Sequence, residues 1–364
     1  MIIQEVINHL EEFAPLSYAE DFDNVGLLVG DKNTQLTGIL VTLDTIETVI
    51  DEAIQNNCNL IVSFHPIIFK GLKKITGTTY VERTVLKAIK NDIAIYAIHT
   101  ALDNAIQGVN DAICNQLKLK NKQILIPQKN TIKKLTTFVP KEEAHTLRTA
   151  LFNAGAGNIG NYSSCSFNSD GIGTFMGNEE SNPTKGIKGE IHKEEETQIT
   201  ITYAKHLEAN ILKTLFKTHS YEEVAYEITT LDNKNQHIGM GMTGELETAM
   251  HETHFLNYLK SQMNTAQLRH SALLDKEIKK IAVLGGSGSF AIDAAKASGA
   301  DAFITADLKY HDFFSAENEI LLIDMGHFES EQFTKNLLVA FLIKKITNFA
   351  VVLSKTNTNP VKYF

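Results

Sequence analysis

The chain contains short, almost continuous apolar runs, each followed by a stretch in which the apolar residues have helical spacing. Three such runs lie in the first third of the chain, at 38–44, 60–65 and 94–99. A strand that is apolar at nearly every position is typical of a parallel sheet that is covered by helices on both faces. The pattern therefore predicts an α/β main domain that is rich in parallel strands.

The last third of the chain repeats this pattern. Strands are predicted at 281–285, 302–307 and 320–324, with helices between them, and 349–353 supplies a final strand. The segment 251–274 is predicted to be helical and to lead back into the main domain. The two thirds could share one sheet or pack as two similar lobes.

The middle of the chain differs, because its predicted strands are more polar and its Gly and Asn content rises. The predicted order is strand, helix, two strands, helix, strand, which is the βαββαβ order of a ferredoxin-like α+β unit. We therefore predict a main domain at 1–126 and 246–364 and an inserted domain at 127–245.

Composition excludes several functional classes. A net charge of -9 argues against a general nucleic-acid binder, which needs clustered Lys and Arg. The three cysteines, Cys58, Cys114 and Cys165, are far apart and form no CxxC pair, so neither a disulfide framework nor a thiolate zinc site is supported. No stretch reaches the roughly 18 apolar residues of a membrane span, and the acidic, amphipathic start does not resemble a signal peptide. We expect a cytoplasmic protein.

Polar side chains that suit a metal ion follow several of the predicted strands. His65 ends one strand, and Asp103 comes shortly after the next. His327 and Glu331 follow the strand that ends at Asp324, and on a helix their four-residue spacing places them on one side. Ligands collect at the carboxyl ends of strands in open α/β sheets. Two imidazoles and two carboxylates suit Zn, Mn, Fe or a similar divalent ion.

Each candidate also has an ordinary structural interpretation. A histidine at a strand end is often simply hydrogen-bonded, Asp103 could cap the following helix, and Glu331 could be a solvated helix residue. The glycine-rich loop at 285–290 could hold an anion with its N–H groups or be only a tight turn. Asp307 and His311 could orient a ligand or lie on a surface helix. No GxSxG motif occurs, which disfavours a Ser-His-Asp hydrolase.

Several segments resemble, in order, the motifs of the GTP cyclohydrolase 1 type 2 homologue family, also called NIF-three-like. They are FDNVGLLVG at 22–30, FHPIIFKGLK at 64–73, HTALD at 99–103, GVND at 108–111, TADLKYHD at 305–312 and GHFESE at 326–331. The middle segment resembles the insert of the longer members, and its HSYEEVAY at 219–226 is similar to a motif of PII-like and CutA-like domains.

The resemblance implies a dinuclear divalent-metal site and a toroidal homohexamer whose openings the inserts cap. It places His65, Asp103, His327 and Glu331 at ligand positions, with Glu331 bridging two ions. The family commonly has two adjacent histidines before the proline, whereas Phe64 occupies the first of these positions here. A phenyl ring offers no lone pair, so one ion loses a ligand. The second site is then weaker, completed by water or absent, and we expect one or two ions per subunit.

Two functions remain open. The first is a divalent-metal-dependent hydrolase, with GTP as the substrate that the resemblance implies, in which the ion activates water. His99 or His311 would carry protons, and Lys70, Lys73 or Lys309 would meet the triphosphate. The alternative is a regulatory or scaffold protein that uses its metal to bind a nucleotide, another small molecule or a partner without turnover.

Overall fold

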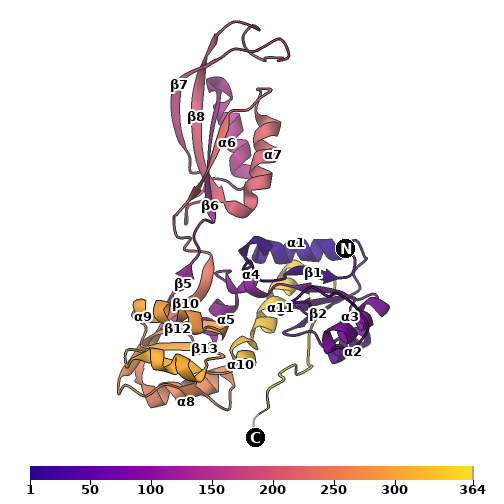
Figure 1. The fold of residues 1–364 in the computed structure, drawn as a ribbon, viewed down its shortest axis with the longest axis vertical. Coiled ribbons are helices and arrows are strands. Elements are labelled where there is room, and N and C mark those ends of the chain that lie inside the picture. The colour runs from indigo at the N-terminus through magenta and orange to yellow at the C-terminus, as the bar shows by residue number, and fades with distance from the viewer. Residues whose placement is uncertain (363–364) are drawn as a thin grey trace. The chain divides into compact units, whose positions relative to one another are not determined.

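The computed structural model describes residues 1–362 (Figure 1). The chain divides into two compact units: unit 1 comprises Met1–Pro127 and the described part of Gln236–Phe364, and unit 2 comprises Gln128–Asn235. The predicted insert ran to residue 245, whereas the structure assigns residues 236–245 to unit 1. The reason is that β10 (Gly239–His251) pairs with two strands of that unit.

The described residues of unit 1 form two sheets, so the two predicted arrays do not share one. The first sheet has the order β1-β4-β3-β2-β15, with β1 antiparallel and the others parallel. Every residue of its three central strands is buried, as the apolar runs predict. Its strands are β1 (Gly26–Val29), β2 (Ile39–Thr42), β3 (Leu60–Ser63), β4 (Ala94–Ala97) and β15 (Val351–Leu353).

Amphipathic helices cover this sheet. Helices α2 and α3 pack on one face through apolar side chains such as Ile50 and Val85. Helix α3 begins after Thr79, whose Oγ1 accepts a hydrogen bond from the Glu82 amide. The helices in this part are α1 (Ile3–Phe13), α2 (Glu47–Gln55), α3 (Tyr80–Lys90), α4 (His99–Asp103) and α5 (Val109–Gln116).

The second sheet has six strands in the order β11-β14-β13-β12-β10-β5. Strands β12, β13 and β14 are parallel, and the other three are antiparallel to their neighbours. Besides β10, its strands are β5 (Lys120–Pro127), β11 (Arg269–His270), β12 (Glu277–Ser287), β13 (Ala302–Ala306) and β14 (Leu321–Asp324). The helices in this part are α8 (Glu252–Met263), α9 (Ile292–Ala297), α10 (His327–Glu331) and α11 (Thr334–Lys345).

The predicted helix at 251–274 is wrong in its second half. Helix α8 ends at Met263, because Asn264 takes a left-handed conformation with φ of 49°. The short strand β11 then pairs with β14. One apolar cluster contains side chains of both sheets, such as Val62 and Ile304, so the two sheets share a core.

Unit 2 is a four-stranded antiparallel sheet in the order β7-β8-β6-β9. Helices α6 and α7 pack on it through side chains such as Leu151 and Leu215. The elements follow the predicted βαββαβ order: β6 (Ile132–Pro140), α6 (Ala144–Asn153), β7 (Phe167–Phe175), β8 (His192–Ala204), α7 (Glu208–Thr218) and β9 (Tyr226–Leu231). Among the helices in residues 1–362, none has the length and apolar character needed to cross a membrane.

Candidate metal centre

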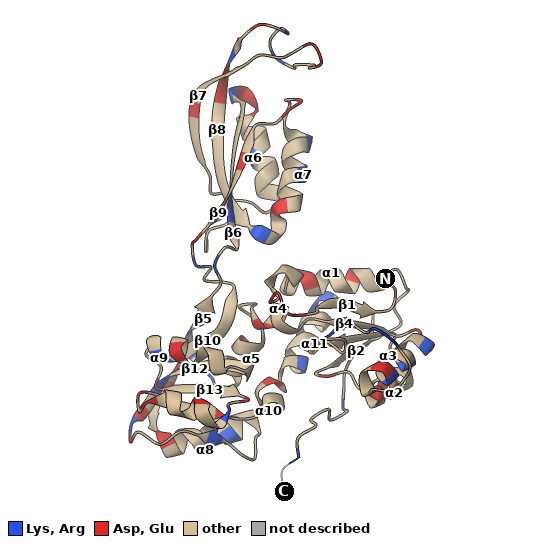
Figure 2. Cartoon of the chain, viewed as in Figure 1, with Lys and Arg blue, Asp and Glu red and all other residues tan. Residues whose placement is uncertain are grey.

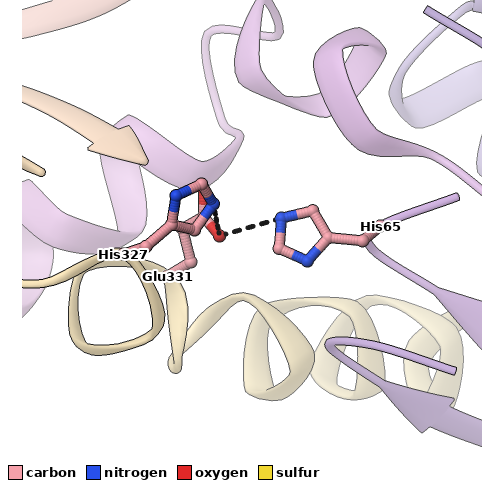
Figure 3. Close-up of side chains that lie close together, drawn as sticks. All are labelled: His65, His327 and Glu331. Carbon is pink, nitrogen blue, oxygen red and sulfur yellow. Dashed lines mark ion pairs between the residues drawn. The ribbon is translucent and has the colours of Figure 1, made fainter. Parts of the chain in front are cut away.

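Three of the predicted ligands converge in unit 1, as Figure 3 shows. His65 follows β3, while His327 and Glu331 are the first and last residues of α10. Glu331 Oε2 lies 3.1 Å from His65 Nε2 and 3.3 Å from His327 Nε2. The potential ligand atoms of these residues all lie within 4.8 Å of one another. The four-residue spacing on a helix thus brings His327 and Glu331 to the same side.

The three groups surround a common point. Glu331 Oε2 is buried, and neither imidazole is aligned to give it a hydrogen bond, although both nitrogens are close. A buried carboxylate oxygen without a hydrogen bond is costly unless another group satisfies it. Two imidazole nitrogens and a carboxylate oxygen that face one point form a suitable ligand set for a divalent cation.

Each imidazole contacts a carboxylate through its other nitrogen. His65 Nδ1 lies 2.8 Å from Asp44 Oδ1, and His327 Nδ1 lies 2.6 Å from Asp307 Oδ2. Such contacts fix the ring orientation and leave Nε2 for a metal. Asp307 therefore orients the candidate ligand His327, which is one of the two roles that the sequence suggests for it. Asp44 is itself held, because Thr358 Oγ1 donates a hydrogen bond of 2.6 Å to Asp44 Oδ2.

Thr358 belongs to a segment after β15, residues 354–361, which we call the C-terminal strap. Its first part is fixed by Glu52 on α2, whose carboxylate accepts hydrogen bonds from the side chains of Ser354 and Thr356 at 2.6 Å. Its last part reaches the candidate site, where Asn359 Nδ2 donates to Glu329 Oε1 at 3.0 Å. The strap thus connects the first sheet to the side chains around the site.

The electrostatics of the cluster favour positive charge next to Glu331. Burial opposes ionisation of Glu331, but the charge of His65 and a contact with His327 outweigh it and lower the pKa of Glu331 to about 2. Burial likewise acts against charged imidazoles, yet Glu331 raises the pKa of His65 to about 10 and that of His327 to about 9. Protons or a bound cation can supply this positive charge.

Helix α4 places two further predicted residues near this cluster. His99 Nδ1 lies 2.9 Å from Asp23 Oδ1, and the His99 ring centroid lies 5.2 Å from that of His65. Asp103 lies outside the three-residue group, but its Oδ1 is buried without a hydrogen-bond partner. Burial raises the pKa of Asp103 well above its usual value, and the charge of Glu331 raises it further. A cation here would relieve both carboxylates.

A cavity of about 510 Å³ opens beside the cluster, and His65, His99 and His327 line it. Most of its charged lining is acidic: Asp44, Asp307, Asp324 and Glu329. Arg269 also lines it, but its Nη1 lies 2.9 Å from Asp324 Oδ2 and its Nη2 donates to the Leu308 carbonyl. The cavity therefore holds excess negative charge in the absence of a cation.

Other candidates from the sequence lie elsewhere. His311 is exposed and contacts Tyr310 and Phe314, and it does not line this cavity. Lys70, Lys73 and Lys309 are likewise exposed and outside the lining. Arg269 was missed because it lies in the segment that was predicted as helix. Asp44 and Asp23 were not predicted, because each contacts a histidine that is distant in the sequence. Asp44 contacts His65, and Asp23 contacts His99.

The first two residues of the glycine-rich loop use their backbone amides in packing. The Gly285 amide donates to Asn110 Oδ1 and the Gly286 amide to Ser330 Oγ, so neither N–H group is available to an anion. Gly286 has φ of 69°, and a Cβ there would lie 2.4 Å from Glu331 Oε1. The tight turn therefore makes room for the carboxylate of Glu331.

Phe64 directly precedes the candidate ligand His65 in the sequence. Its side chain is fully buried in the core of unit 1. Its ring centroid lies 4.8 Å from that of His65 and 5.5 Å from that of His99. An apolar ring thus stands next to the candidate ligands.

Comparison with known proteins gives a consistent result. The family model Duf34/NIF3 (NGG1p interacting factor 3) matches residues 1–360. A Bacillus subtilis protein named GTP cyclohydrolase 1 type 2 homolog is 35% identical, over 99% of this chain and 98% of its own. The crystal structure of a Bacillus cereus protein related to NIF3 has a TM-score of 0.86 at 36% identity, and covers 100% of this chain and 99% of that one. A Staphylococcus aureus protein of known structure has a TM-score of 0.80 at 30% identity, with the same coverage. The chain therefore belongs to the Duf34/NIF3 family.

Proposed function

We propose that unit 1 binds a divalent metal ion through His65, His327 and Glu331, and that the protein uses this ion to hydrolyse a nucleotide. The observation that carries the proposal is that two imidazoles, each held by a carboxylate at its Nδ1, converge on a buried Glu331 oxygen that accepts no hydrogen bond. Asp103 supplies a fourth ligand, because its own buried oxygen has no other partner. Mixed nitrogen and oxygen ligands leave Zn, Mn and Fe as candidates.

The number of ions follows from Phe64. A second ion would need ligands beyond the set that converges on Glu331, and the phenyl ring of Phe64 supplies none. We therefore propose one tightly bound ion per chain, and a second only at a weaker site that water completes. The acidic cavity lining supports cation binding in general.

The residues around the cluster suit hydrolysis. When bound, such an ion lowers the pKa of water towards neutrality and so supplies a nucleophile. His99 is the proposed proton carrier, since Asp23 contacts its Nδ1 and its ring lines the cavity beside His65. Arg269 is the cationic side chain in the lining that a phosphate group would meet. The relatives' name suggests GTP as the first nucleotide to test.

The second candidate is a metal-dependent regulator or scaffold without turnover. Phe64 favours this candidate, because losing one ion of a metal pair makes the site a poorer activator of water. The acidic lining of the cavity also favours it, because negative charge disfavours a polyphosphate. In either case we propose a cytoplasmic homohexamer. Exposed apolar side chains on unit 1, such as Phe290, Tyr310 and Phe314, support self-association. Light scattering of the purified chain measures its oligomeric state.

The test combines metal content with turnover. The purified chain is stripped of metal, reconstituted with Zn, Mn or Fe, and analysed for metal per chain and for hydrolysis of a nucleotide panel that includes GTP. We expect metal-dependent turnover that His65→Ala abolishes with its circular dichroism unchanged, whereas His311→Ala retains it. Metal binding without turnover of any nucleotide would refute the hydrolase and leave the regulator. A chain that binds no metal would refute both.

A further inference from the structure

Unit 2 contains a cavity of about 760 Å³ that is separate from the residues of the candidate metal centre. It is formed by the end of β7, the segment that joins β7 to β8, and the segment before β9. This volume lies within the range of small-molecule sites, which is roughly 300–1,000 Å³. Phe138, Phe175, Met176 and Tyr221 give it an apolar, largely aromatic wall.

A buried carboxylate belongs to the same lining. Glu196 is only 9% exposed, and Tyr221 donates a hydrogen bond of 2.7 Å to its Oε1. Within the described residues, its Oε2 has no hydrogen-bond partner. A Cβ on Gly173 would lie 2.1 Å from this oxygen, so the glycine leaves the space that Oε2 occupies. Glu196 and Gly173 both line the cavity. The cavity therefore contains a positioned carboxylate with one oxygen available to a ligand.

The surrounding charge selects the kind of ligand. Glu180, Glu222 and Glu223 also line the cavity, and Figure 2 shows further acidic residues along β8. Lys185 is the cation in the lining, and its Nζ lies 3.0 Å from Glu142 and 3.4 Å from Glu194, which offset its charge. An anion would thus meet excess negative charge, and an uncharged ligand would leave Glu196 uncompensated.

A metal ion is also disfavoured in this cavity. Within residues 1–362, the group of His, Cys, Asp or Glu side chains that converges as a metal site is the one in unit 1. Carboxylates that face an aromatic wall instead suit an organic cation, because the ring faces attract positive charge and the carboxylate accepts charge-assisted hydrogen bonds.

We propose that this cavity binds an organic ammonium ion with an apolar body. The ammonium group donates to Glu196 Oε2, and the apolar body contacts Phe175 and Tyr221. These two rings lie 5.6 Å apart between centroids in an edge-to-face arrangement, so they form one side of the site. The proposal gives unit 2 a ligand-binding role that is independent of the metal centre.

The first experiment uses the unmodified full chain. Isothermal titration compares 2-phenylethylammonium with its uncharged analogue 2-phenylethanol, and butylammonium and spermidine are titrated in parallel. We expect at least one ammonium ion to bind, and 2-phenylethylammonium to bind about tenfold more tightly than the alcohol. Equal affinity for the two phenyl compounds, or no binding of any ammonium ion, would overturn the proposal.

The second experiment locates the site. Glu196→Gln keeps the shape and the Tyr221 contact but removes the charge, and we expect binding of the ammonium probe to weaken roughly 10- to 100-fold. Glu227→Gln removes the same charge at an exposed position of β9 outside the lining and should leave binding unchanged. If Glu196→Gln does not fold, Gly173→Ala, which crowds Oε2, replaces it. An unchanged affinity in a folded cavity variant contradicts the assignment.

Discussion

Histidines lie beside both sites, but the two units use their ring nitrogens differently. In unit 1, His65 and His327 contact carboxylates through Nδ1 and direct Nε2 towards Glu331. In unit 2, His192 Nε2 lies 2.8 Å from Glu194, and His219 uses both nitrogens, since Nε2 contacts the Phe138 carbonyl and Nδ1 accepts from the Tyr221 amide.

This difference shows what distinguishes a candidate ligand from a structural histidine. The deciding feature is whether ring nitrogens converge on a buried carboxylate oxygen that has no hydrogen-bond partner, as they do at Glu331 Oε2. Within residues 1–362, the His, Cys, Asp and Glu side chains that converge as a possible metal site are His65, His327 and Glu331 in unit 1.

The largest effect should come from His327→Ala. Loss of one of three converging ligands should reduce the metal content from about one ion per chain to none after dialysis. His192→Ala is the matched control, because its ring nitrogen is already engaged by Glu194 in unit 2. Plasma mass spectrometry measures the metal. Equal loss in both variants would remove the contrast between the units.

Phe64→His should have the next largest effect, because it supplies an imidazole next to His65. We expect the metal content to rise towards two ions per chain. Phe64 is fully buried, so the free energy of unfolding should fall by about 3 kcal/mol. Metal analysis and guanidinium unfolding measure the two results. Phe138→His makes the same exchange in the cavity of unit 2 and should add no ion. If Phe138→His gained an ion and Phe64→His did not, unit 2 and not unit 1 would be the unit prepared to bind metal.

Asp307→Asn should weaken metal binding without abolishing it. The amide keeps the shape but loses the charge that supports His327, and such changes typically cost about 10- to 100-fold in affinity. Competition with a chromogenic chelator measures the dissociation constant. Glu194→Gln is the control, because it alters the partner of His192 in unit 2. We expect this variant to keep the wild-type affinity for the metal.

The smallest effect concerns acid stability. Hydrogen bonds from the Thr76 side chain and from the Thr76 and Thr78 amides lower the pKa of Glu82 in unit 1 from 4.5 to about 2. Because the folded pKa is lowered, this carboxylate stabilises unit 1 above pH 4.5, and its contribution is lost as the pH falls towards 2.

The Glu82→Gln variant should accordingly have a lower unfolding temperature than the wild type at pH 7. The gap should narrow between pH 4.5 and 2, as thermal melts at several pH values would show. Glu227→Gln in unit 2, at an exposed position, serves as the control. A gap for Glu82→Gln that stays constant across this range would mean that Glu82 does not act through its charge.

Much of this arrangement was predictable from the sequence. Buried parallel strands give continuous apolar runs, so β2, β3, β4, β13 and β14 could be located, and the strand ends then indicated His65 and the pair on α10. Sheet membership could not be predicted, because an apolar run does not specify its neighbour. For this reason the division into two sheets, and the pairing of β15 with β2, come only from the structure.

The supporting contacts of the site were harder to predict for a related reason. Asp44 bonds a histidine 21 residues away, and Asp23 bonds one 76 residues away. Such pairs depend on how strands and loops pack, and no local spacing identifies them. Asp307 could be identified as a candidate because it ends a predicted strand. Arg269 was not predicted as a site residue, because the apolar spacing of 251–274 predicts one continuous helix. In the structure Asn264 ends this helix before Arg269.

The C-terminal strap has a consequence for biosynthesis. Thr358 and Asn359 leave the ribosome after His65, after all of unit 2 and after α10, yet they hydrogen-bond to the carboxylates of Asp44 and Glu329 beside the site. Chains fold progressively from the N-terminus during synthesis. We therefore expect a nascent chain that already contains all proposed ligands to retain metal less well than one in which the strap has also emerged, so that metal loading is a late step in the maturation of the protein.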